Sequence, residues 1–131
     1  MSPGDAEELL VAALNAKQAV TNLCGGRIAT LLHGTYPAIR ISLVGGPPRP
    51  ADHTAAPTLQ AECWADGSGS AAQDQAAKLA RAVEEAALSL AGTYPAGTIV
   101  GSWTEGYIIH SADAQTSRER YIVQIGLLTQ P

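Results

Sequence analysis

Basic residues are scarce in this chain. Lysine and arginine together number 8, against 12 aspartates and glutamates, which gives a formal net charge of −4. Outside the loops, the closest basic pair is Arg118 and Arg120. Proteins that bind nucleic acid regardless of its sequence carry clustered lysine and arginine that contact the phosphates. The composition therefore disfavours a nucleic-acid-binding protein.

Cysteine is also rare: the two thiols, Cys24 and Cys63, are too few for a disulfide framework or a zinc site. The first residues, MSPGDAEELLVAAL, are acidic where a secretory signal is basic, and their apolar run is interrupted early. No segment has the roughly 20 apolar residues of a transmembrane helix. We therefore expect no export signal, no membrane span, and two reduced thiols that pack as small apolar groups.

Catalytic and metal-binding motifs are absent from the sequence. His33, His53 and His110 lie far apart, without an HExxH or HxH pattern and without a carboxylate at ligand spacing. A Cys63–histidine pair would supply a nucleophile and a base, but Cys63 falls on the inward face of an expected strand, where burial disfavours the thiolate. Prolines, not a helix, follow the glycine pair at residues 45–46, so no phosphate-binding loop is expected. We expect no enzymatic activity, no cofactor and no metal.

Charged residues make up only 15% of the 131 residues, below the roughly 25% of typical soluble domains. The length fits a single domain over residues 1–131. A lightly charged surface indicates that other protein covers part of it, although alanine accounts for much of the apolar fraction.

Two segments have helical patterning. In the first, four apolar residues recur at helical spacing: Leu9, Leu10, Ala13 and Leu14. This pattern predicts a helix over residues 3–19. A second helix is predicted over residues 70–90, because Ser70 and Gln73 have capping-box spacing and apolar residues recur every three or four positions. Gly92 is expected to close this second helix.

Alternation of apolar and polar residues predicts strands over residues 36–44 and 58–65. In the first strand the apolar positions are Ile39, Ile41 and Leu43. In the second strand they are Leu59, Ala61, Cys63 and Ala65. Trp64 is the exception, because it falls on the polar face beside Glu62. Either a helix covers that face as well, or the tryptophan meets a partner protein.

Further strand patterns occur at residues 27–32, 98–103 and 106–111. Residues 120–128 are apolar on both faces, which is typical of a central strand that is covered on two sides. The order of these elements predicts an α+β fold, a largely antiparallel β-sheet with two α-helices packed on one face.

A long proline-rich loop separates two of the expected strands. The stretch GGPPRPADHTAAP, at about residues 45–57, contains four prolines, which cannot join a central strand and which stiffen the backbone. Loops of this length in compact domains are usually functional or disordered.

The order of these segments resembles that of the tail terminator proteins of long-tailed bacteriophages, also called tail completion or minor tail proteins, especially those of phages that infect actinobacteria. The resemblance covers about residues 5–128. Its most specific parts are YPAIRISLVGG before the proline-rich loop, TLQAECWAD after it, and the C-terminal RYIVQIGLL. It implies a structural virion protein that forms a homo-oligomeric ring, a hexamer, at the head-proximal end of the tail tube. Such a ring ends tube polymerisation and joins the tail to the head connector.

The resemblance also implies partners and a location. The partners are further copies of the chain, the tail-tube protein and the head–tail connector protein, with DNA only as cargo in the channel. The chain would be assembled in the host cytoplasm and reside at the neck-proximal end of the virion tail. A cyclic ring needs two different, matching patches on each subunit. We expect them in residues 45–57 and 103–118. The candidate interface residues are Pro47, Pro48, Arg49, Pro50, His53, Trp64, Trp103, Tyr107, Arg118 and Arg120.

Three other hypotheses stay open. The chain is another head–tail connector or tail-tube component, a small ligand-binding module with the proline-rich loop as a lid, or a hydrolase that uses Cys63 and a histidine. Tube proteins polymerise along the axis, a ligand-binding module is a monomer with a saturable site, and the hydrolase would lose turnover in a Cys63→Ala variant.

Overall fold

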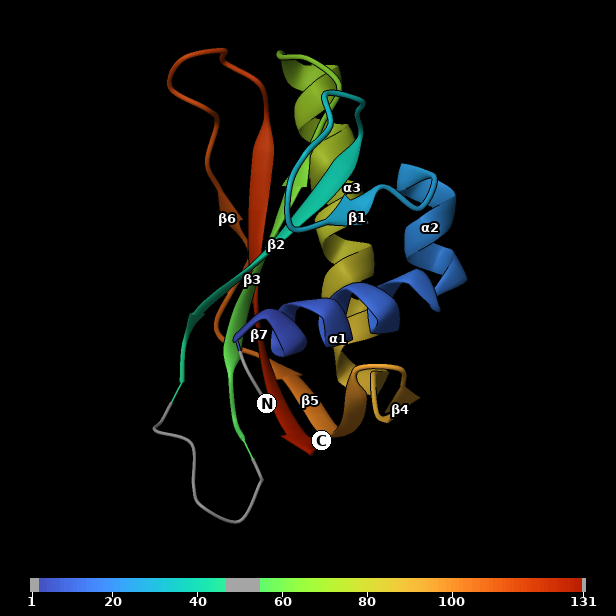
Figure 1. The fold of residues 1–131 in the computed structure, drawn as a ribbon. Helices are drawn as coiled ribbons and strands as arrows, with labels where there is room; N and C mark the ends of the chain where they lie inside the picture. The colour runs from blue at the N-terminus through green and yellow to red at the C-terminus, as the bar shows by residue number, and fades with distance from the viewer. Residues whose placement is uncertain (1–2, 47–54, 131) are drawn as a thin grey trace.

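The computed structural model describes residues 3–46 and 55–130 (Figure 1). Its helices are α1 (Pro3–Asn15), α2 (Gln18–Cys24), α3 (Ser70–Ala86) and the 3-10 turn η1 (Ala87–Ser89). Its strands are β1 (Ile28–Ala29), β2 (Ala38–Gly45), β3 (Thr58–Trp64), β4 (Gly92–Tyr94), β5 (Gly97–Thr104), β6 (Ile109–His110) and β7 (Arg120–Gln130).

The strands form one seven-stranded sheet in the order β1-β2-β3-β7-β5-β4, with β6 also paired to β7. Every pair is antiparallel except β1 and β2, which run parallel. After β1, residues 30–37 carry the chain back to the end of the sheet where β1 began, so that β2 runs in the same direction. The α+β class is as expected. The sheet is mixed, however, and three α-helices rather than two occur in the described residues. Alternation of apolar and polar residues predicts where strands lie, but not whether neighbouring strands run parallel or antiparallel.

The first helical segment, expected over residues 3–19, is two helices. Lys17 has extended backbone, with φ −99° and ψ 105°, and α2 begins after it. The pattern gave no sign of this break, because alanine and lysine at positions 16 and 17 both favour helices. Packing explains it, since α1 lies against β2 whereas α2 lies against α3. Within residues 3–46 and 55–130, no helix is both long and apolar enough to cross a membrane.

The helices cover one face of the sheet, as expected, and the core lies between the two layers (Figure 1). The strand side chains in this core are the alternating ones: Ile39, Ile41, Leu59, Ala61, Cys63, Val123, Ile125 and Leu127. We call the opposite side of the sheet the open face. The prediction that β7 is covered on both sides is wrong, since Ile122, Gln124 and Leu128 on its open face are only partly buried.

The ends of α3 differ from the prediction. Gly69, not Ser70, is the N-cap, and no side chain caps the helix. Instead, the Gln73 backbone N–H donates to the Gly69 carbonyl at 2.9 Å. The helix ends at Ala86, the chain tightens into η1, and Gly92 then begins β4. The buried stripe of α3 is as predicted.

β5 and β6 follow one another along the same edge of β7. Residues 98–104 pair with residues 125–130, and residues 109–110 pair with residues 121–122. Between them, the Glu105 N–H still donates to the Gln124 carbonyl at 2.9 Å, and residues 106–108 leave the ladder. β6 is therefore shorter than the strand expected at residues 106–111, as β1 is shorter than that expected at residues 27–32.

Candidate functional site

A charged cluster crosses three strands of the open face. The register places Arg40 opposite Glu62 on β2 and β3. Glu62 Oε1 accepts a hydrogen bond from Arg40 Nη1, and Glu62 Oε2 accepts one from Arg120 Nη1, each at 2.7 Å. Arg120 also donates to the carbonyl and the hydroxyl of Ser111, each at 2.9 Å. Each carboxylate oxygen of Glu62 therefore has a guanidinium group of its own.

Glu62 is buried although none of the described helices covers its face. Its side chain is 6% exposed, against 41% for Arg40 and 21% for Arg120. The two arginines therefore shield the carboxylate while they keep contact with solvent. A buried carboxylate is costly unless it is paired, and two charge-assisted hydrogen bonds compensate this one. We call Arg40, Glu62 and Arg120 the arginine–glutamate triad.

Aromatic side chains lie under two arginines beside this triad. The Arg120 guanidinium carbon is 4.9 Å from the centre of the Trp64 ring, and that of Arg118 is 3.8 Å from the centre of the Tyr36 ring. The centres of the two aromatic rings are 6.4 Å apart. These are cation–π distances, and they fix both guanidinium groups over flat apolar surfaces. Trp64 thus packs beside Arg120 and Tyr36 of its own chain, on the face that none of the described helices covers.

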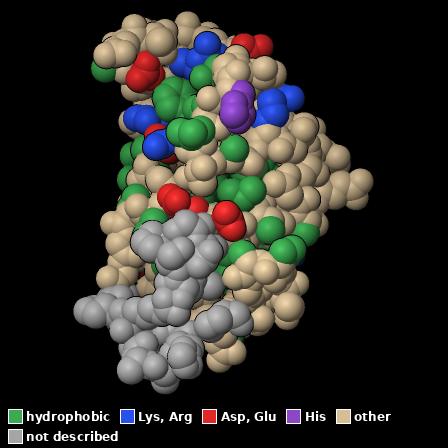
Figure 2. Space-filling model, viewed as in Figure 1, with side chains coloured by type: hydrophobic (Ala, Val, Ile, Leu, Met, Phe, Trp, Pro, Cys, Tyr) green, Lys and Arg blue, Asp and Glu red, His purple; other side chains and the backbone are tan. Residues whose placement is uncertain are grey.

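Three of the residues expected at an interface lie in this cluster. Trp64, Arg118 and Arg120 converge, and Figure 2 shows lysine and arginine side chains gathered over the upper half of the face in view. Arg118 and Arg120 make ion pairs within the chain, at 3.8 Å to Asp66 and 2.7 Å to Glu62. Five expected interface residues lie outside the described residues: Pro47, Pro48, Arg49, Pro50 and His53.

Trp103 and Tyr107 lie apart from that cluster, along β5 and the connection to β6. Trp103 Nε1 donates to Glu105 Oε1 at 2.7 Å. The indole lies directly over Gly126 of β7, where an added Cβ would be only 2.2 Å from Trp103 Nε1. Tyr107 is 93% exposed. The two residues therefore differ, since Trp103 packs on the sheet and Tyr107 projects from it.

The turn between β6 and β7 is ordered by its own hydrogen bonds. The Asp113 carboxylate accepts from the Thr116 hydroxyl at 2.7 Å and from the Thr116 N–H at 2.9 Å. These bonds, the hydroxyl first, lower the pKa of Asp113. Ser117 has a φ of 59°, which closes the turn. Because the lowered pKa favours the carboxylate, the bonds persist at neutral pH and are lost only as pH falls through that lowered pKa.

Three members of the cluster escaped the sequence analysis: Tyr36, Arg40 and Glu62. Alternation did place Arg40 and Glu62 on the polar faces of their strands. Only the register between β2 and β3 brings them opposite each other. Nothing in the sequence set Tyr36 apart, because its partner Arg118 lies far along the chain.

Both cysteines are free and buried, as expected. Burial raises the pKa of the Cys63 thiol far above its ordinary value, and it raises the pKa of Cys24 as well. The thiolate is the reactive form of cysteine, and burial disfavours it at both positions. This is the opposite of what a Cys63-dependent hydrolase needs.

We expect both thiols to resist modification in the folded protein. At about pH 8, Ellman's reagent should titrate neither cysteine of the native chain, because both sulfurs lie in the core and stay protonated. After unfolding in guanidinium chloride, both should react. Fast reaction of either thiol while circular dichroism still reports the native fold would contradict this expectation.

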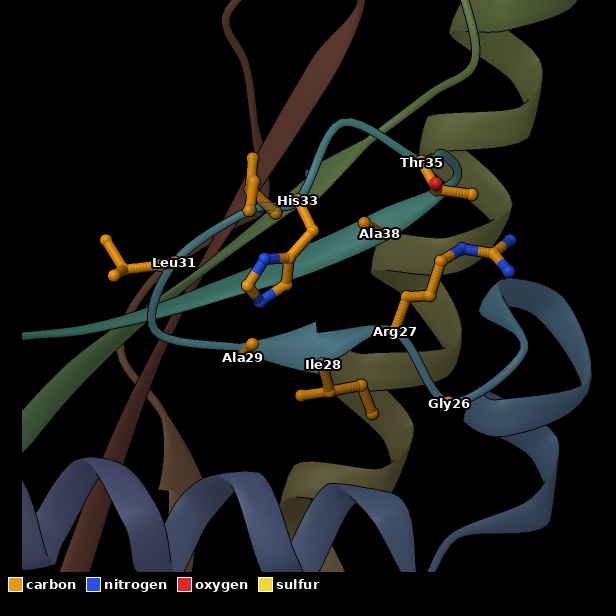
Figure 3. A pocket seen from close by; sticks show the side chains of 9 residues that line it. Gly26, Arg27, Ile28, Ala29, Leu31, His33, Thr35 and Ala38 are labelled. Atoms are coloured by element: carbon orange, nitrogen blue, oxygen red, sulfur yellow. The ribbon is translucent and has the colours of Figure 1, made fainter.

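A pocket of about 360 Å³ lies beside β1 (Figure 3). The residues that line it are Gly26, Arg27, Ile28, Ala29, Leu31, Leu32, His33, Thr35 and Ala38. Figure 3 shows the His33 imidazole over β1, directed toward Ala29. Arg27 Nε donates to the Pro37 carbonyl at 2.9 Å, which holds the guanidinium in place. No carboxylate of residues 3–46 and 55–130 lines this pocket.

Metal-binding chemistry finds no support in the part of the chain that the structure describes. There, no group of three or more histidine, cysteine, aspartate or glutamate side chains is placed to hold an ion. The arrangement on the open face is instead one of fixed cations, aromatic surfaces and a preformed turn. Such an arrangement suits recognition of another protein surface.

Comparison with known proteins gives a structural match. No family model and no curated protein sequence matches the chain. Among solved structures, the chain is similar to a chain of one described as the virion of a native gene transfer agent particle, with a TM-score of 0.63. The match covers 91% of this chain and 90% of that chain, at 20% sequence identity. At that identity, the match shows that the two chains share a fold over nearly their whole lengths.

Proposed function

We propose that this chain is a structural virion protein of a phage-like particle, and that it acts there as a tail terminator. In this role, copies of the chain form a ring, a hexamer, at the head-proximal end of the tail tube. The ring ends polymerisation of the tube and joins it to the head connector. The chain performs no catalysis, and DNA passes only through the channel.

The observation that carries the proposal is the shared fold with a virion chain, which spans nearly all of both molecules. Independently, the three sequence stretches that resemble tail terminators include β2, β3 and β7, which form the centre of the sheet. The resemblance and the structural match therefore concern the same elements. Both favour a part of a virion over an enzyme.

The described surface also suits assembly. In a ring, each subunit uses two different patches, because the contacts are head to tail. The triad and the β6–β7 turn are held by internal hydrogen bonds, so they lose little conformational freedom on docking. Of the expected proline-rich patch, residues 47–54 lie outside the described residues. The described ends pair within the chain, since Gly45 belongs to β2 and Ala55 bridges to Thr129.

Electron microscopy of the purified chain, alone and with tail-tube protein, tests the proposal. We expect closed rings of uniform diameter, and rings at one end of tubes when tube protein is present. Indefinite tubes of the chain alone would favour a tail-tube component. Rings that bind only the connector protein would favour a connector role. A chain that stays monomeric at all concentrations and binds no tube would contradict the proposal.

The pocket beside β1 favours a second candidate, a small ligand-binding module. Its volume of about 360 Å³ lies at the lower end of the roughly 300–1,000 Å³ of small-molecule sites. A monomer that gains thermal stability with one small molecule, saturably and without assembly, would support that function instead.

A further inference from the structure

We propose that the pocket beside β1 receives Tyr107 from a second copy of this chain. The inference rests on the proposed function, since it names the two surfaces that would meet around the ring. It assigns the pocket to protein rather than to a small ligand. It also pairs an expected interface segment, residues 103–118, with a surface that the sequence analysis did not consider.

The receiving surface is apolar and lies at one edge of the sheet. β1 is the first strand in the sheet order and has only two residues, Ile28 and Ala29. These residues also line a second hollow, of about 310 Å³, on the side of α1. Farther along β2, the edge is occupied, because Glu7 Oε2 accepts the Leu43 N–H at 2.9 Å. The pocket beside β1 is thus the accessible part of this edge.

The inserted surface lies at the opposite side of the sheet. Tyr107 is 93% exposed and Ile109 is 54% exposed, so the connection from β5 to β6 presents two large apolar side chains to solvent. Tyr107 therefore buries very little of its side chain within its own chain. Tyrosine is among the residues that most often anchor protein interfaces, where it buries roughly 150–250 Å².

The strand register places the pocket beside β1 and the start of β6 in the same row of paired residues across the sheet. Ala29 pairs with Arg40, Arg40 with Glu62, Glu62 with Ile122, and Ile122 with Ile109. A single row across the sheet therefore runs from β1 to β6. Four inter-strand spacings separate its ends by about 19 Å, so Tyr107 cannot fill the pocket of its own chain. A neighbour placed edge to edge brings its β5–β6 connection beside β1.

Charge is complementary between the two surfaces. Among the described residues, Arg27 is the charged side chain that lines the pocket, and none of their carboxylates lines it. The segment 103–110 contains Glu105 and has no lysine or arginine. Glu105 is exposed, two residues before Tyr107. A docked Tyr107 therefore brings an anion toward Arg27, and opposite potentials across a contact favour the correct pairing.

Cross-linking of mixed single-cysteine chains tests this pairing. One chain carries Ile109→Cys, which leaves the Tyr107 side chain in place, and the other carries His33→Cys; both replaced side chains are exposed. The native thiols are buried and give little background. A short bis-maleimide should join the mixed chains at least ten times more efficiently than it joins either variant to itself. A Leu88→Cys chain is the control for Ile109→Cys, since Leu88 is also exposed but lies in η1.

A complementation experiment tests the head-to-tail geometry. Tyr107→Ala removes the inserted side chain, and Leu31→Glu places a carboxylate at the pocket to repel Glu105. Each variant alone should associate about tenfold more weakly or worse, the loss typical of an interface anchor. Mixed together, they should form a dimer through the one intact contact and no larger species. Leu88→Glu is the matched control, because Leu31 and Leu88 are 69% and 66% exposed.

The outcomes separate this inference from the proposed function. Rings that form normally with Tyr107→Ala or Leu31→Glu, without cross-links between positions 33 and 109, overturn the pairing and leave the ring proposal standing. A wild-type chain that neither assembles nor cross-links overturns both. A small molecule that saturates the pocket while the rings stay intact also overturns the pairing.

Discussion

Replacing Glu62 by alanine is expected to lower the free energy of unfolding by about 3 kcal/mol, the lower end of the range for breaking a buried ion pair. The lower end applies because Arg40 and Arg120 both reach solvent and can hydrate when the carboxylate is gone. What remains is repulsion between two guanidinium groups and the loss of two hydrogen bonds of 2.7 Å. Denaturant unfolding at a fixed protein concentration measures the change.

Two variants serve as controls for this result. Glu62→Gln keeps the shape and one carbonyl acceptor, so its loss should be smaller than that of alanine. Glu85→Ala removes an exposed carboxylate of α3 that makes no hydrogen bond or ion pair with the described residues, and its effect should be within about 0.5 kcal/mol. If Glu62→Ala destabilised the chain no more than Glu85→Ala does, the triad would not stabilise the fold.

Replacing Gly126 by alanine is expected to cost about 1–3 kcal/mol, the usual penalty for an added group in a filled site. The new Cβ would be 2.2 Å from Trp103 Nε1 and 2.3 Å from Trp103 Cε2, so the indole has to move. The displaced indole would lose its hydrogen bond to Glu105 and become more exposed to water. We expect the tryptophan emission to shift to longer wavelength as stability falls.

Gly101→Ala is the matched control for Gly126→Ala. Gly101 also lies in a strand at negative or extended φ, but nothing lies within 4 Å of the position of its added Cβ. That variant should be neutral or slightly stabilising. A Trp103→Ala background should also abolish most of the cost of Gly126→Ala, because the two sites then no longer clash. Equal losses with and without Trp103 would show that the indole is not the cause.

Periodicity predicted the buried side of the molecule well. Ile39 and Ile41 alternate with polar residues, and so do Leu59, Ala61 and Cys63, and all five are buried where expected. The apolar stripe of α3 lies in the same core. Such patterns succeed because a residue that faces the core must be apolar whichever neighbour it packs against. The ends of the helices were predicted less well, and nothing in the sequence indicated the break between α1 and α2 at Lys17.

The candidate site was only partly predictable. Trp64 stood out because a tryptophan on a polar strand face is unusual, and Arg118 and Arg120 stood out as the closest basic pair. Glu62 was seen only as one of several polar residues. It becomes the centre of the triad because β3 pairs with β2 on one side and β7 on the other. These pairings join residues 22 and 58 positions apart.

The amino-acid order therefore decided which residues enter the core and which segments become helices or strands, because local spacing alone separates an inner from an outer face. The tertiary structure decided the direction of β1 and the division of α1 from α2. It also decided the strand register that brings Arg40, Glu62 and Arg120 together. The physical reason is distance along the chain. A register is chosen by the simultaneous burial of many remote side chains, and no short stretch contains that information.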